Sequence, residues 1–66
     1  MHYVVKSSDG RFLEFCPWTG EAKLLPAKAS VFATLAYSEQ AAYAMICDIK
    51  GRWPNLTFTV HSLQEI

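Results

Sequence analysis

The 66-residue sequence has no surplus of charge of either sign, because six Lys and Arg balance six Asp and Glu. Without a net charge, no long-range field draws the chain to nucleic acid or to an anionic bilayer, and no dense acidic surface mimics DNA. The sequence also lacks a basic segment followed by an apolar one at its start, and a clean apolar run of about 20 residues. We therefore expect no secretory signal, no membrane contact and a cytoplasmic location.

Cysteine is scarce, since only Cys16 and Cys47 occur. Two cysteines without a secretory signal are typical of reduced thiols, so we expect no disulfide bond. With His2 and His61 they have the ligand types that zinc prefers, but no two of the four are close in sequence, whereas structural zinc sites use closely spaced pairs. We expect neither a metal nor a cofactor.

The motifs of common catalytic sites are missing as well. The sequence has no phosphate-binding loop, no paired-carboxylate motif and no serine-centred elbow. Pairing either cysteine with His61 would supply a nucleophile and a base, but catalysis also needs an orienting group, an oxyanion hole and a cleft. A chain of this length has little room for these, so we expect that it is not an enzyme.

Apolar residues, by contrast, are plentiful: hydrophobic residues make up 52% of the chain and aromatic residues 14%. This composition is typical of a globular domain, and the length predicts a single domain over residues 1–66. A chain this short buries only roughly 60% of the surface that it exposes when unfolded. Because small domains often gain stability by association, we expect a homodimer or a protein partner.

Alternation and turn residues predict a small antiparallel sheet. The pair Asp9-Gly10 is a strong turn signal between two β-rich segments, and Leu56 to His61 alternates apolar with polar residues. Two prolines and a glycine make 17–28 a loop, with a short extended piece at 23–25, and 29–32 either adds a brief strand or leads into a helix. The predicted strands are His2–Ser7, Arg11–Cys16 and Leu56–His61, with the fourth left open.

The segment from Thr34 to Gly51 predicts one helix across a face of this sheet. Thr34 and Ser38 are both good N-caps, so the first residue stays open, while Gly51 and Pro54 end the helix. The fold is therefore α+β, with three or four strands in the order β-β-(β)-α-β. The helix stripe that faces the core is Leu35, Ala42, Met45, Ile46 and Ile49. The full predicted core is Val5, Leu13, Phe15, Ala42, Ile46, Ile49, Phe58 and Val60.

The outer face of this helix is the predicted protein-binding surface. It carries an aromatic, small residues and little charge, whereas a surface helix normally carries Lys, Glu and Arg there. Near the helix end we expect Arg52 to contact the partner and Trp53 to close the core. The predicted partner-binding residues are Tyr37, Gln40, Ala44, Cys47, Asp48, Arg52 and Trp18.

An alternative is nucleic-acid binding by the sheet, because aromatic side chains on a sheet can stack on single-stranded bases. The candidate rings lie close in sequence to two cations, Lys6 and Arg11. They are Tyr3, Phe12, Phe15 and Trp18. The balanced charge and the absence of a matching motif favour the protein partner.

Four short features resemble the small β-β-α-β proteins carried by phages and other mobile elements. These are the Tyr-Val-Val-Lys strand from Tyr3, the Asp-Gly-Arg turn from Asp9, the Phe32-x-Thr34 segment and the Ala41-Ala42 pair. Some proteins of this kind are anti-CRISPR inhibitors, so the resemblance implies an inhibitor that binds a bacterial surveillance complex. Because the chain has no net charge, such a role implies surface complementarity and not DNA mimicry. The resemblance assigns no site residues.

Overall fold

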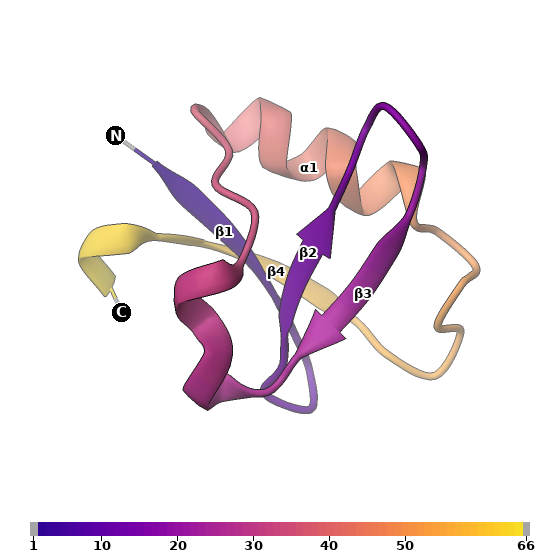
Figure 1. Ribbon diagram of the computed structural model, residues 1–66, viewed down its shortest axis with the longest axis horizontal. Helices are drawn as coiled ribbons and strands as arrows, with labels where there is room; N and C mark the ends of the chain where they lie inside the picture. The colour runs from indigo at the N-terminus through magenta and orange to yellow at the C-terminus, as the bar shows by residue number, and fades with distance from the viewer. Residues whose placement is uncertain (1, 66) are drawn as a thin grey trace.

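A computed structural model describes residues 2–65, which form a four-stranded antiparallel sheet with one α-helix packed across one face (Figure 1). The sheet order is β3-β2-β1-β4. The α+β prediction is confirmed, and the short extended piece at 23–25 is a full strand. The elements are β1 (Tyr3–Ser7), β2 (Phe12–Phe15), β3 (Ala22–Leu25), the 3₁₀ helix η1 (Ala27–Phe32), α1 (Glu39–Asp48), β4 (Phe58–Ser62) and the 3₁₀ turn η2 (Leu63–Glu65).

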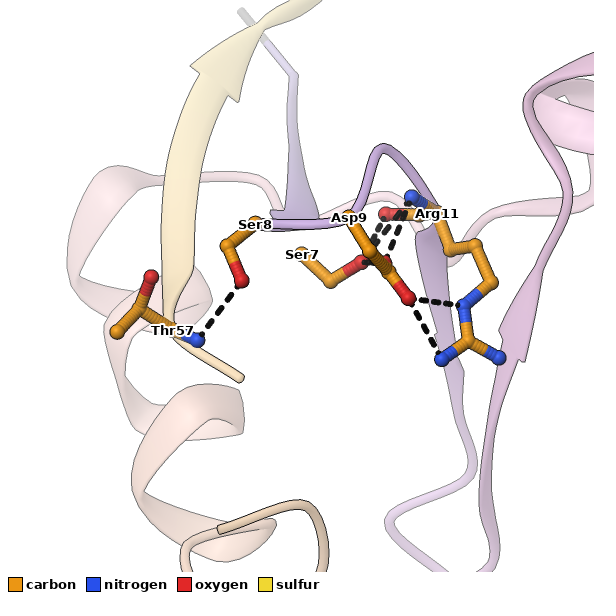
Figure 2. Close-up of polar contacts among 5 residues, drawn as sticks. All are labelled: Ser7, Ser8, Asp9, Arg11 and Thr57. Atoms are coloured by element: carbon orange, nitrogen blue, oxygen red, sulfur yellow. Dashed lines mark hydrogen bonds and ion pairs between the residues drawn. The ribbon is translucent and has the colours of Figure 1, made fainter. Parts of the chain in front are cut away.

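The turn between β1 and β2 is held by a polar cluster (Figure 2). Gly10 has a φ of +89°, which suits glycine, and its amide donates to the carbonyl of Ser7 at 3.0 Å. The Asp9 carboxylate accepts from the Ser7 hydroxyl and from Nε and Nη2 of Arg11, at 2.8 and 2.7 Å for the two nitrogens. These contacts with Arg11 and Ser7 lower the pKa of Asp9 from 3.8 to about 2.

β1 lies between β2 and β4, and its pairing with β4 runs along the whole strand, from Tyr3 opposite Ser62 to Ser7 opposite Phe58. β4 begins at Phe58 and not at Leu56, because the Leu56 amide instead donates to the carbonyl of Trp53 at 3.0 Å in a turn. The predicted strand therefore starts two residues too early. Its alternation is confirmed, since Phe58 and Val60 pack against the core while Thr59 is exposed.

The helix begins after Ser38, which settles the alternative between Thr34 and Ser38. The Ser38 hydroxyl accepts from the amide of Ala41 at 3.0 Å, and Glu39 lies in the first turn, where a negative charge favours the helix dipole. The helix ends earlier than predicted: α1 stops at Asp48 with Ile49 as its C-cap, and Gly51, with a φ of +89°, lies in the turn that follows. Leu35 was wrongly included in the core-facing stripe, because it precedes the helix and is 52% exposed.

Apolar side chains gather on both faces of the sheet. The larger cluster lies under α1, and all eight predicted core residues belong to it. Five of them are buried, whereas Ile46, Phe58 and Val60 are only partly buried. A second cluster, which sequence reasoning missed, consists of Val4, Phe12 and Ala33. Ala33 directly follows η1, so residues 29–32 form part of a 3₁₀ helix and not a strand.

The chain crosses between these faces through a gap in the sheet. β1 and β2 pair at Lys6 and Phe12, next to their turn, and residues 34–36 bond to both strands farther along. The Thr34 amide donates to the carbonyl of Leu13 at 3.1 Å, while Tyr3 and Ala36 exchange two backbone hydrogen bonds of 2.8 Å. Ala33 thus packs on one face and Ala36 on the other. We call residues 33–38 the connector.

Among residues 2–65, no helix combines the length and the apolar character needed to cross a bilayer.

Candidate functional site

The segment from η1 to α1 has an unusual distribution of side chains. Two small residues, Ala33 and Ala36, point into the two apolar clusters and are 7% and 4% exposed. The large apolar residues around them point outward. These are Val31, Phe32, Leu35 and Tyr37, with exposed fractions of 82%, 67%, 52% and 81%, and we call them the 31–37 patch.

The backbone of the connector explains why the large residues cannot turn inward. Thr34 is fixed by its side chain as well as by its amide: its hydroxyl accepts from the Phe15 amide at 2.7 Å and donates to the Phe15 carbonyl at 3.2 Å. The bridge between Ala36 and Tyr3 fixes the next inward position. Because small residues occupy both inward positions, the patch is held outward by the fold itself.

The predicted outer face of α1 is exposed along its whole length. Gln40, Ala44, Cys47 and Asp48 are all exposed, and Tyr37 is exposed in the connector just before the helix. The predicted position of Tyr37 on this face requires a helix from Thr34, so its position differs from the prediction, although it is exposed as predicted. The alternative that Tyr37 packs onto the sheet edge is wrong.

Sequence reasoning missed three exposed residues that belong to this region. Tyr43, on α1, is 54% exposed, and Val31 and Phe32 precede the connector. The Ser38 cap is a signal for Leu35 alone, because a helix that begins after Ser38 does not contain Leu35. The connector runs from η1 to the N-terminal end of α1 (Figure 1). Leu35 and Tyr37 therefore lie next to the helix in the chain, whereas Val31 and Phe32 belong to η1, which leads into Ala33 on the other face of the sheet.

The two remaining predicted residues, Trp18 and Arg52, belong to the opposite end of α1. Trp18 lies in the loop between β2 and β3 and is 92% exposed. A β-carbon placed on Gly20 of this loop would be 3.9 Å from Nη2 of Arg52, so the guanidinium lies beside the loop. Figure 1 shows the tip of the β2–β3 hairpin near the C-terminal end of α1. Trp53 packs against Phe58 with a ring distance of 6.2 Å and closes the core, as predicted.

An open groove of about 640 Å³ runs beside this loop, and its lining includes Cys16, Glu21 and Arg52. Hydrogen bonds from the hydroxyl and the amide of Thr19 lower the pKa of Cys16. Both Cys16 and Cys47 are free thiols. Among residues 2–65, no three His, Cys, Asp or Glu side chains come together in a way that could hold a metal ion.

The sheet aromatics that could stack on bases are mostly covered. Phe12 is 5% exposed in the cluster with Val4, and Phe15 is 7% exposed on the other face, under α1. The ammonium of Lys6 lies 5.7 Å from the centre of the Phe12 ring. Of the four candidate rings, Trp18 is the exposed one, so the geometry offers no row of accessible rings on the described sheet.

The polar cluster at the β1–β2 turn also ties β4 to the turn. The Ser8 amide donates to the Thr57 carbonyl at 2.8 Å, and the Ser8 hydroxyl accepts from the Thr57 amide at 3.2 Å (Figure 2). We interpret this cluster as stabilising the turn and not as a binding site, because its polar groups are bonded to one another. The comparisons add no further candidate: no protein-family model, curated protein or solved structure matches this chain.

Proposed function

We propose that this chain is a small protein-binding module that acts as an inhibitor or adaptor. Its partner docks on the 31–37 patch and on the outer face of α1. The observation that supports this most strongly is the inverted burial around the connector, where alanines fill the interior and large apolar side chains face solvent. An isolated exposed apolar residue is ordinary, but four of them between residues 31 and 37 are not.

The size of the patch fits this role. A fully exposed Phe or Tyr offers roughly 150–250 Å², so Phe32 and Tyr37 at 67% and 81% exposure contribute roughly 100–200 Å² each. With Val31 and Leu35 the exposed apolar area of the four side chains totals roughly 400–600 Å², divided between the end of η1 and the connector. A standard interface takes about 800 Å² from each partner, so the outer face of α1 would complete it.

The chemistry of this surface indicates how the partner is held. Phe32 and Tyr37 are aromatic anchors of the kind that dominate interface energetics. Ala44 and Cys47, being small, allow close approach of a partner element along α1. The chain carries no net charge, so recognition depends on shape and apolar contact and not on long-range attraction.

The finer part of the proposal comes from the resemblance to phage and mobile-element proteins. On this resemblance we propose that the partner is a protein subunit of a bacterial surveillance complex and that the chain is an anti-CRISPR inhibitor. We also propose a cytoplasmic location, as expected from the sequence. The free thiols of Cys16 and Cys47 support a reducing compartment.

The test is capture of a partner from a lysate of the bacterial host. The patch variant combines Phe32→Ser with Tyr37→Ser, and Ala44→Arg separately blocks the helix face. Leu63→Ser is the control, because Leu63 is an exposed apolar residue that belongs to neither surface, and Trp18→Ser separately tests the predicted contact at the other end of α1. We expect the parent and the control to retain the same protein and both surface variants to lose it.

A gel shift with single- and double-stranded DNA and RNA accompanies the capture experiment. Equal capture by parent and patch variants would contradict the proposed surface. A nucleic-acid shift without any captured protein would replace the proposal with the alternative of nucleic-acid binding. Circular dichroism of each variant tests whether its fold is intact.

A further inference from the structure

The two edge strands of the sheet, β3 and β4, differ in how well they are protected against pairing with another strand. β3 has four residues, with the exposed Lys23 within it and Pro26 directly after it. Natural proteins use short strands, lysine and proline in this way to prevent edge-to-edge pairing. β4 has five residues, Phe-Thr-Val-His-Ser, and contains neither a proline nor a charged Asp, Glu, Lys or Arg. β4 therefore lacks the protection that β3 has.

The core is also open along β4. Val5 and Leu13, in the two central strands, are fully buried, whereas Phe58 and Val60 face the same cluster and are only partly buried. An open groove of about 590 Å³ lies between the C-terminal end of α1 and the start of β4. Its apolar lining includes Ile46, Trp53, Leu56 and Phe58. A strand added to β4 would cover the apolar surface that is exposed along this edge of the core.

The backbone of β4 is arranged to accept such a strand. The Thr57 carbonyl and the Leu63 amide bond to Ser8 and His2, at 2.8 and 3.0 Å, on either side of the ladder with β1. Hydrogen-bonded positions alternate in an antiparallel pair, so residues 57, 59, 61 and 63 direct their N–H and C=O groups toward β1. Phe58, Val60 and Ser62 direct theirs toward the open side.

We propose that β4 pairs antiparallel with β4 of a second copy of this chain, which joins the two sheets across a two-fold axis at Val60. In this register Val60 lies opposite its own copy, and Phe58 lies opposite Ser62. Phe58, Val60 and Ser62, whose backbone N–H and C=O groups point to the open side, therefore lie opposite residues of the second copy whose backbone groups also point to the open side. On the other face, Thr59 lies opposite His61, so the register juxtaposes no Asp, Glu, Lys or Arg.

A second copy fits this edge better than a foreign peptide for three reasons. The strand is complementary to itself in the two-fold register, which is the requirement for an isologous interface. Two copies of a chain with no net charge do not repel each other. The seam, about 17 Å long for five residues, brings the partly buried Phe58 and Val60 of both copies together and covers apolar surface that each copy leaves open. The protected β3 edges then lie outermost, so assembly stops at the dimer.

Sedimentation analysis over a range of concentrations tests the proposal. Thr59→Lys places a lysine in the edge on an exposed side chain, and Thr19→Lys is the matched control, with the same substitution in the β2–β3 loop. We expect the parent and Thr19→Lys to dimerise and Thr59→Lys to stay monomeric. A parent that remains monomeric up to millimolar concentration overturns the proposal. So does a dimer that persists in Thr59→Lys but dissociates in Tyr37→Ala, because that dimer would use the 31–37 patch.

Amide hydrogen exchange of the parent provides a readout that needs no variant. We expect exchange at Phe58, Val60 and Ser62 to slow as concentration rises, because these amides become bonded only in the dimer. Thr59 and His61 already bond to β1 and serve as internal controls that stay protected. Concentration-independent exchange at the three outward amides would overturn the proposal even if the protein dimerised, because the β4 edge would not be the interface.

Discussion

Replacing Ile49 with alanine should remove much of the stability of this domain, whereas the same change at Ile46 should cost clearly less. Ile46 lies in the last turn of α1, Ile49 is its C-cap, and both belong to the predicted core, but Ile49 is 1% exposed and Ile46 is only partly buried. The same side-chain atoms are removed at both positions, so the difference between the two losses of stability reports burial. Comparing the two losses therefore shows which side of the helix faces the core.

The magnitude follows from the atoms removed. Ile→Ala deletes three carbon atoms, worth roughly 2.4 kcal/mol at about 0.8 kcal/mol for each buried methylene. At Ile49 an enclosed cavity adds to this, which raises the expected loss to about 3 to 4 kcal/mol. At Ile46 solvent reaches the site, so the loss should be about 1 to 2 kcal/mol. A domain of 66 residues has a total stability of roughly 3 to 10 kcal/mol.

Urea unfolding followed by circular dichroism measures both losses. The protein concentration is kept low and equal, so that association does not add to the apparent stability. Leu13→Ala is the positive control, because Leu13 is 0% exposed in the same cluster. Equal losses at Ile49 and Ile46, or a larger loss at Ile46, would refute the assignment of Ile49 to the enclosed side of α1.

Three further predictions concern hydrogen bonds. Ser38→Ala should cost about 1 kcal/mol of stability through loss of the helix cap, whereas Ser38→Asp should keep the stability of the parent. Thermal melting measures both variants, and an unchanged stability of Ser38→Ala would mean that the cap is not formed. The pKa of Asp9 is lowered in the folded state by the side chain of Arg11, so its stabilising effect is present above about pH 4 and disappears as the pH falls toward 2. The difference in melting temperature between the parent and Asp9→Asn should shrink over this range, and a constant difference would contradict the pairing. Thr34→Val should destabilise by about 1 to 2 kcal/mol because it leaves the backbone of Phe15 without its partner, whereas Thr34→Ser should melt like the parent.

Local chemistry made the strands, the first turn and the approximate helix end predictable. Asp9-Gly10 encodes a turn through backbone freedom at Gly10, and Gly51 followed by Pro54 encodes a stop. Alternation identified the inward side of β4. In each case the information lies within a few residues of the feature it specifies.

The connector could not be predicted because its conformation depends on residues distant in sequence. Thr34 looks like a helix cap by type, yet its hydroxyl bonds to Phe15, 19 positions earlier. That contact leaves Ser38 as the cap and moves Leu35 out of the helix. The outward position of Leu35 follows from the same contact. Of the 31–37 patch, the sequence therefore indicated only Tyr37.

The sheet order also determines when the fold can form. β1 is the first strand of the chain and occupies a central position, but one of its two partners, β4, is near the other end of the described sequence. During synthesis β1 can pair early with β2, while its other side must wait until β4 has left the ribosome. Such distant pairing raises the contact order and slows folding for a domain of this size. Until then, Val5 lacks the cover that β4 and α1 give it in the folded domain.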